Sequence, residues 1–372
     1  MSATVPTAAV DTDAARQLLI DLVDTPSVTP EEEAAAAVLV DFFEAHGREV
    51  WVDDVGNVRA PADDGVLLTS HIDTVPGDIP VRVETMAAGE ARFGGESDLL
   101  DAAESIDVLW GRGSVDAKGP LASMAVVAVE TGASFVGVVG EEVDSRGGRY
   151  LVEDREAEPD VVINGEPSGW EGITLGYRGL LGGNYVATSE SGHSSRPDDN
   201  AIQDAINWWN RVEEEFDPDD WVPVFERVTP KPTSIDGGMT EDGLSVEATM
   251  RLQLRVPPEY TTDEIREITD GHLENGTVHW DDRVEPVMMS PRTEPARAFR
   301  AAIRQEGGDP RLLRKTGTSD MNVYADSWDC PMVTYGPGDS DLDHSPNEHL
   351  PLPEYDRSVA VLHSATETLL EE

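Results

Sequence analysis

The chain has 372 residues, of which 74 are Asp or Glu and 27 are Lys or Arg, so its formal net charge is −47. So negative a surface argues against nucleic acid as a partner, because phosphates are bound by clusters of Lys and Arg. Hydrophobic residues make up 39% of the chain, which is enough for a packed core and excludes an acidic disordered protein.

Lysine is almost absent, since only Lys118, Lys231 and Lys315 occur. An acidic surface without lysine is one adaptation to molar intracellular salt, where charge repulsion is screened. We therefore expect a protein from a halophilic archaeon.

The sequence carries no sign of export or membrane insertion. Cys330 is the only cysteine, which excludes a disulfide framework and fits a reducing compartment. The N-terminus lacks a signal-peptide pattern, and no stretch approaches 18 apolar residues. A cytoplasmic protein with no membrane partner is expected.

The first part of the chain predicts two helices, a hairpin and a central strand. Helical spacing covers Asp13–Asp24, and Thr29–Glu32 has the form of a capping box that opens a helix ending at His46–Gly47. Valines between Val50 and Val55 alternate as in an edge hairpin, and the apolar run Val66–Asp73 indicates a buried strand.

The next part predicts an α/β sheet interrupted by a surface loop. Val81–Val108 is acidic and rich in Gly and Ala, and we expect it to be a mobile, salt-adapted loop. A helix over Pro120–Glu130 then separates buried strands at Phe135–Val139 and Val161–Ile163. This order predicts an open, largely parallel sheet with its site at the carboxyl ends of the strands.

From about residue 173 the pattern changes to alternating segments and amphipathic helices. It predicts a small α+β domain of four strands and two helices, with strands at 180–188 and 244–256 and helices at 201–215 and 262–275. The first domain then resumes with a helix at 296–306, a strand at 332–335 and a helix at 353–370. The expected domains are therefore 1–172 with 287–372, and 173–286.

The end of the strand at Val66–Asp73 carries a metal-binding pattern. His71 and Asp73 are two positions apart, so both lie on one face of an extended backbone. A ligating imidazole usually donates its other ring N–H to a carboxylate, which fixes its tautomer. We expect His71 to be a ligand and Asp73 its partner.

Four further blocks follow in order, and they are Gly111–Gly119, Gly140–Glu142, Gly165–Pro167 and Asp343–Glu348. Together with His71 and Asp73 they resemble the M20 family of dinuclear zinc peptidases and deacylases. The resemblance covers nearly the whole chain. It implies a zinc-peptidase-like α/β/α catalytic domain with an inserted ferredoxin-like α+β lid and dimerisation domain.

The resemblance also implies a ligand set for two divalent metal ions. Asp116 would bridge them, His71 and Glu166 would complete one site, and Glu142 and His344 would complete the other. Zinc suits this mixture of imidazole and carboxylate, with cobalt as the alternative. Two metals about 3.5 to 4 Å apart lower the pKa of a water and polarise a carbonyl.

Glu141 lies beside a ligand without being one, so it is the expected general base. Because about one residue in five is acidic, a carboxylate at any one position is weak support. Only 8 histidines occur, so His71 and His344 within their blocks weigh more. The other histidines outside the lid motif described below are expected to be ordinary surface or packing residues.

Three more blocks, Gly165–Gly179, Ser234–Gly238 and Lys315–Asn322, are similar to the LysK branch of the family. That branch releases lysine or ornithine from a small acidic amino-group carrier protein, LysW. Arg178 and Arg255 resemble its carboxylate-reading arginines, and Gly317 and Thr318 its backbone contact to the same group.

Other activities stay open at this point. An acetylornithine deacetylase, a succinyl-diaminopimelate desuccinylase or a general aminoacylase or dipeptidase would use the same centre, although the desuccinylase asparagine has no clear counterpart near Glu241–Leu244. A non-catalytic metal-binding or carrier-docking protein is a further alternative, but it would have no need of Glu141.

The resemblance implies two further features. One is a cis peptide between Asp116 and Ala117. The other is a role for His193, within Ser191–Pro197, as a donor to the oxyanion in the active site of a partner subunit, which requires a homodimer or higher oligomer. A turn or capping histidine is the alternative for His193.

We expect the protein to lose structure when salt is withdrawn, because unscreened repulsion among its charges then opposes compaction. Helical circular dichroism measured from molar salt down to dilute buffer checks this. An undiminished signal in dilute buffer would contradict the halophilic interpretation.

Overall fold

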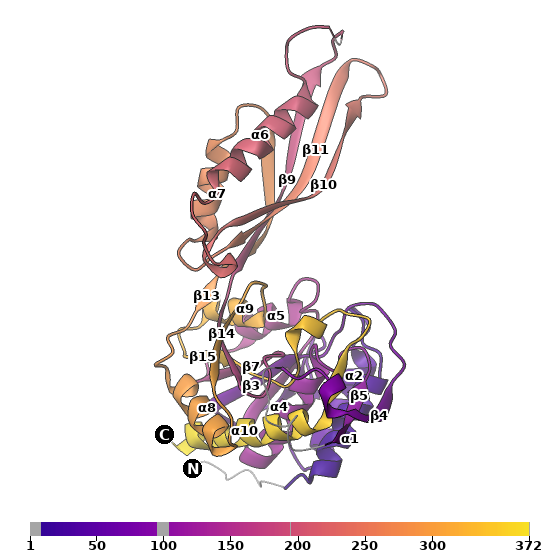
Figure 1. The fold of residues 1–372 in the computed structure, drawn as a ribbon, viewed down its shortest axis with the longest axis vertical. Helices are drawn as coiled ribbons and strands as arrows, with labels where there is room; N and C mark the ends of the chain where they lie inside the picture. Colours follow the sequence, from indigo (N-terminus) through magenta and orange to yellow (C-terminus); the bar gives the residue numbers. More distant parts are fainter. Residues whose placement is uncertain (1–8, 95–103, 194, 372) are drawn as a thin grey trace. The chain divides into compact units, whose positions relative to one another are not determined.

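The computed structural model describes residues 9–94, 104–193 and 195–371 (Figure 1). The chain divides into two compact units. The first comprises the chain up to Leu175, Met289–Leu313 and Val323–Glu372, and the second comprises Gly176–Met288 and Arg314–Asn322. The segment 314–322, which the sequence analysis assigned to the first domain, therefore groups with the second.

The first unit is built on a mixed sheet. Among the described residues the strands of this sheet lie in the order β1 (Trp51–Val52), β2 (Val58–Ala60), β6 (Ala133–Val138), β3 (Asp63–His71), β7 (Val162–Gly165), β15 (Met332–Thr334), β8 (Gly172–Tyr177) and β13 (Val287–Met288), with β14 (Arg311–Lys315) also on β8. By the division above, β13 and the carboxyl ends of β8 and β14 are counted with the second unit. The four inner strands β6, β3, β7 and β15 are parallel, as predicted. β1 and β2 form the predicted antiparallel edge hairpin.

Helices cover this sheet because their apolar faces match its buried strands. Among the described residues, the α-helices of this unit are α1 (Thr12–Asp24), α2 (Glu33–Ala45), α4 (Lys118–Thr131), α5 (Arg146–Asp154), α8 (Glu294–Gln305) and α10 (Leu352–Glu371), and α9 (Asp320–Ser327) begins in the second unit and ends in the first. α4 is apolar on all sides and is buried from Lys118 to Val129. It packs on β3 and β6, and α1 and α10 pack on α4 in turn.

The start of α2 differs from the prediction. The helix begins at Glu33 without a side-chain cap, and the Thr29–Pro30 peptide is cis. The Thr29 hydroxyl donates instead to Asp73 Oδ2 at 2.6 Å. The capping-box prediction is wrong because a tertiary partner distant in sequence binds the hydroxyl that a local cap would have used.

The prediction of a mobile loop at 81–108 is also wrong for the part of this segment that the structure describes. β4 (Arg82–Ala87) and β5 (Ser105–Trp110) pair antiparallel, β16 (His349–Pro351) joins the other side of β5, and η1 (Ala88–Glu90) follows β4. Ile106 and Val108 alternate with polar residues and pack in a small apolar cluster with Phe93. Residues 95–103 lie outside the described residues.

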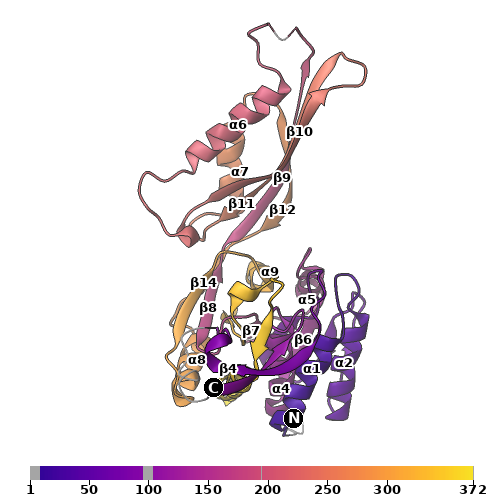
Figure 2. The same cartoon turned by 45° about the vertical axis from the view of Figure 1, so that its right-hand side comes forward.

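The second unit has the predicted four-stranded sheet. Its order is β10 (Thr229–Met239), β11 (Ser245–Val256), β9 (Gly179–Glu190) and β12 (Thr277–Val284), all antiparallel. α6 (Ala201–Glu215) and α7 (Thr262–Gly271) cover one face of the sheet (Figure 2). Tyr185 and Trp208 stack in the core at 4.7 Å between ring centroids.

None of the helices in the described part of the chain has both the length and the apolar character that crossing a bilayer requires.

Candidate metal centre

The carboxyl ends of three neighbouring parallel strands supply most of the predicted site. β3 ends at His71, and Asp73 follows two residues later. Glu141 and Glu142 come just after β6, and Glu166 directly follows β7. Since these strands are parallel neighbours, their ends meet at one edge of the sheet.

The remaining two predicted ligands arrive through the small three-stranded sheet. Asp116 lies in the loop after β5, and His344 lies in the loop before β16. Trp110 at the end of β5 pairs with His349 at the start of β16, so the two loops leave the same edge. His344 has a φ of +57°, a left-handed backbone that non-glycine residues adopt mainly at sites that require it. The Asp116–Ala117 peptide is cis, as expected.

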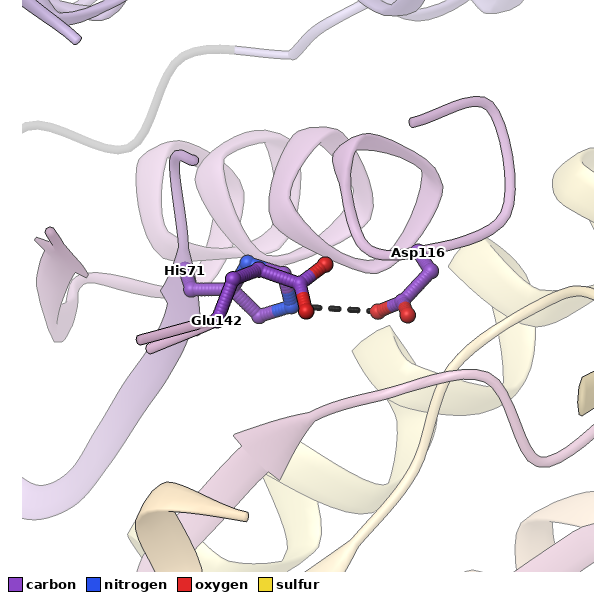
Figure 3. Close-up of side chains that lie close together, drawn as sticks. All are labelled: His71, Asp116 and Glu142. Carbon is purple, nitrogen blue, oxygen red and sulfur yellow. Dashed lines mark hydrogen bonds and ion pairs between the residues drawn. The ribbon is translucent and has the colours of Figure 1, made fainter. Parts of the chain in front are cut away.

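Asp116 lies between the two histidines. Its Oδ1 is 3.1 Å from His71 Nε2, and its Oδ2 is 3.3 Å from His344 Nε2. Figure 3 shows the Asp116 carboxylate directed toward His71, with Glu142 beside them. One oxygen therefore faces each histidine, which is the arrangement of a carboxylate that bridges two ions.

The other predicted ligands complete two overlapping groups. His344 Nε2 lies 3.0 Å from Glu142 Oε2, and His71 Nε2 lies 3.9 Å from Glu166 Oε1. Ligand atoms about 2.0 to 2.2 Å from a tetrahedral ion are about 3.3 to 3.6 Å from one another. The observed separations lie within a few tenths of an ångström of this range, and the donors are imidazole and carboxylate groups, which suit divalent metal ions.

His71 is held in a defined tautomer. Its Nδ1 is 2.9 Å from the backbone oxygen of Asp73 and 3.6 Å from Asp73 Oδ1. The Nδ1–H group therefore donates to the main chain, and Nε2 is directed at the site. The predicted partner residue is present, but its main-chain oxygen, and not its carboxylate, makes the close contact.

The Asp73 carboxylate has a different task. It is fully buried, and it accepts hydrogen bonds from the backbone N–H groups of Glu141 and Glu142, both at 3.1 Å. The Thr29 hydroxyl is its third donor. Asp73 thus holds the turn that carries Glu141 and Glu142. Thr29 is a further contributor to the site, and its sequence context alone favours a helix cap instead.

The charges of the site also fit a cation. Burial and the neighbouring Asp116 raise the pKa of the Glu142 carboxyl to about 7. The hydrogen bond to Asp116 raises the pKa of His344 to about 9. Burial opposes ionisation of Asp116, yet contacts with His344 and His71 hold its pKa below the ordinary value. The carboxylates thus bind positive charge strongly, which divalent metal ions would supply.

Glu141 is half-buried at the edge of this cluster. Its backbone N–H is bound to Asp73 Oδ1, so the residue keeps a defined place beside Glu142. Its role as the base stays a prediction.

Arg178 belongs to the second unit and is buried there. Its Nε donates to the backbone oxygen of Thr316 at 3.0 Å, and its Nη1 donates to Thr229 Oγ1 at 2.8 Å. Its backbone N–H also donates to the backbone oxygen of Lys315. Arg178 therefore anchors the segment that leads into Gly317 and Thr318.

Arg255, also in the second unit, lies on β11 opposite Thr229. Its Nη1 is buried and has no hydrogen-bond partner among the described residues. Burial and the nearby guanidinium groups of Arg255 and Arg227 lower the pKa of Arg178 to about 10. An anion beside these arginines would satisfy the buried donor and reduce the repulsion.

His193 lies in the second unit, just after β9, and is exposed. The N–H of Ser195 donates to its Nδ1 at 3.3 Å, and Ser195 Oγ lies 2.8 Å from the same atom. With Nδ1 as an acceptor, the neutral ring carries its proton on Nε2. Ser194 lies outside the described residues.

Comparison with known proteins gives a family and named relatives. The model of "Peptidase family M20/M25/M40" matches residues 67–368. The LysW-lysine hydrolase of Deinococcus radiodurans is 41% identical over 97% of this chain and 98% of its own. A putative LysW-lysine/LysW-ornithine hydrolase of Thermococcus kodakarensis is 36% identical over 95% of this chain and 91% of its own.

Solved structures share the fold at low sequence identity. An M20 family metallo-carboxypeptidase from Sulfolobus solfataricus matches with a TM-score of 0.72 at 17% identity, covering 96% of this chain and 99% of its own. The YXEP protein of Bacillus subtilis, described as a dinuclear metal binding peptidase from the M20 family, matches with a TM-score of 0.66 at 14% identity, covering 97% and 98%.

We expect the metal-free protein to bind Zn²⁺ or Co²⁺ more tightly as pH rises from 7 to 9. His344, whose pKa is raised to about 9, is protonated over this range, and a metal must displace that proton. Each displaced proton changes the apparent affinity about tenfold per pH unit below the pKa. Titration against a competing chelator at several pH values measures this, and an affinity that does not change over the range would contradict it.

Proposed function

The chain belongs to peptidase family M20/M25/M40 and is a hydrolase of amide bonds, and on that premise we propose that it releases lysine, ornithine or both from a LysW-type amino-group carrier protein. The observation that carries this proposal is the similarity to LysW-lysine and LysW-ornithine hydrolases over nearly the full length of both chains. It includes the second unit, where the expected substrate-reading residues lie.

Two divalent metal ions are proposed as cofactors, with zinc as the first choice and cobalt as the alternative. His71, Asp116 and Glu166 would hold one ion, and His344, Asp116 and Glu142 would hold the other. When bound, such a pair lowers the pKa of a water and polarises the scissile carbonyl.

Glu141 is proposed to move the proton. As the general base it takes a proton from the attacking water and gives it to the leaving amine, which would be the α-amino group of lysine or ornithine. The hydrogen bond from its backbone N–H to Asp73 supports this role, because it keeps Glu141 beside the ligand Glu142.

The second unit is proposed to read the carboxylate of the amino acid. The buried Nη1 of Arg255 is the donor best suited to that anion, since it has no hydrogen-bond partner among the described residues. Arg178 would contribute mainly by anchoring Lys315 and Thr316, so that Gly317 and Thr318 are presented to the same group.

His193 is proposed to donate from Nε2 to the oxyanion in the site of a partner subunit, so the active form would be a homodimer or a higher oligomer. The contact of Ser195 with Nδ1 supports this, because it favours the tautomer with the proton on Nε2.

The substrate assignment is tested by incubating metal-loaded protein at high salt with carrier-linked lysine, carrier-linked ornithine, acetylornithine and succinyl-diaminopimelate. Mass spectrometry of the carrier and quantification of free amino acids measure the reaction. We expect release from one or both carrier substrates.

Hydrolysis of acetylornithine or succinyl-diaminopimelate with the carrier left intact would overturn the carrier assignment and favour the deacetylase or desuccinylase alternative. Metal-loaded protein that hydrolyses none of these amides would favour the non-catalytic alternative.

Glu141→Gln should keep both metals and the fold but lower turnover by several orders of magnitude, since it removes a proton carrier and no ligand. Metal analysis and kcat, measured on one preparation, check the metal content and the turnover. Near-normal turnover would exclude Glu141 as the base.

His193→Ala should lower turnover about 100- to 1,000-fold with little change in KM, because an oxyanion donor acts mainly in the transition state. Mixing this variant with Glu141→Gln subunits should restore activity, since some sites in the hybrids then combine an intact base with an intact donor. Hybrids shown to have exchanged subunits, yet still inactive, would rule out the shared site.

A further inference from the structure

Glu348 closes the Asp343–Glu348 block, and the mechanism above gives it no role. Its side chain is fully buried, and it is not among the predicted ligands. A buried carboxylate needs compensating donors, so the donors around it show what the residue holds.

The donors come mainly from the loop that carries Asp116. Glu348 Oε1 accepts the backbone N–H groups of Val115 at 2.9 Å and Asp116 at 3.1 Å. Glu348 Oε2 accepts Nη1 of Arg112 at 2.7 Å. Arg112 in turn donates from Nε to the backbone oxygen of Gly77 at 3.1 Å, so the ion pair is itself anchored.

Glu348 connects the loop that carries His344 to the loop that carries Asp116. His344 is four residues before Glu348 in the same loop, while Asp116 is bound through its own N–H. The pairing of Trp110 with His349 brings the two loops to one edge of the small sheet. The Glu348 carboxylate then ties them directly at that edge.

We infer that Glu348 is a positioning residue that sets Asp116 against His344 and so determines how tightly the ion between Asp116, Glu142 and His344 is held. Arg112 is its charge partner. The inference rests on the proposed metal centre and does not depend on which amide is cleaved.

The chemistry of the contact requires a carboxylate. Glutamine at this position would keep one oxygen for the two backbone N–H groups, but its NH₂ group would face the Arg112 guanidinium. Two donors would then oppose each other in a buried place, and the loop would have to shift to relieve them.

The test is Glu348→Gln, with binding of Zn²⁺ to the metal-free protein measured by competition with a chelator. We expect one of the two binding steps to lose about 10- to 100-fold in affinity, the range found when partners of metal ligands are altered. Co²⁺ spectra should show a changed coordination for the ion that is lost first. Circular dichroism should show that the metal-free variant is folded, although its thermal midpoint should fall further than that of the control, because the Arg112 guanidinium loses its charged partner.

Glu171→Gln is the matched control. Glu171 is also a buried carboxylate that accepts a backbone N–H, that of Asp309 at 2.8 Å, but it holds no ligand loop. This variant should bind Zn²⁺ like the parent protein.

Arg112→Gln is a second, milder variant that keeps the carboxylate and its backbone donors, and it tests the inference if Glu348→Gln does not fold. We expect a loss of a few fold in the same binding step. If neither variant weakens Zn²⁺ binding more than Glu171→Gln does, the inference is wrong. Because the readout is metal binding, failure of the carrier assay leaves this result intact.

Discussion

The carboxylate of Asp116 contacts ring nitrogens of His71 and His344, which lie far apart in the sequence. The fold of the first unit brings the three residues together. His71 arrives on an inner strand of the parallel sheet, while Asp116 and His344 arrive on loops of the small three-stranded sheet. In the proposed bridging role, Asp116 tolerates little error in these positions, because both of its oxygens must find a partner. The large sheet and the small three-stranded sheet therefore have to be held in a fixed relative position.

Buried carboxylates that accept backbone N–H groups fix much of that relative position. Asp73 holds the turn after β6, and Glu348 holds the loop after β5. Glu354, at the start of α10, accepts the N–H groups of Gly94 and Gly338 in the same way, and burial raises its pKa to about 7. In this acidic chain, some carboxylates thus hold buried loops through hydrogen bonds, while others contribute surface charge.

Local patterns were sufficient to predict much of the fold. The helix predicted at 201–215 is α6 with these same bounds, and in the structure Asn200 caps it and Trp208 lies on its buried face. The strand ending at His71 and the parallel order of its neighbours followed from apolar runs with chemistry at their ends. The roles of residues that depend only on their own segment can therefore be predicted from the sequence.

Residues whose role depends on a distant segment were not accessible in this way. Thr29 fits a helix cap locally, yet its hydroxyl binds Asp73. β5 has a strand alternation, but β16, its partner on one side, comes from near the end of the chain. The role of Glu348 follows only once Val115 and Asp116 are seen beside it.

The chain enters the second unit from β8 and returns from it along β13, and these strands pair directly, with Tyr177 opposite Val287. The two ends of the excursion are thus neighbours, and β6, β3 and β7, which carry the predicted ligands, lie further inside the sheet. A change in the length of the chain between Tyr177 and Val287 would leave this pairing in place, but the segment 314–322 would still have to fit the second unit.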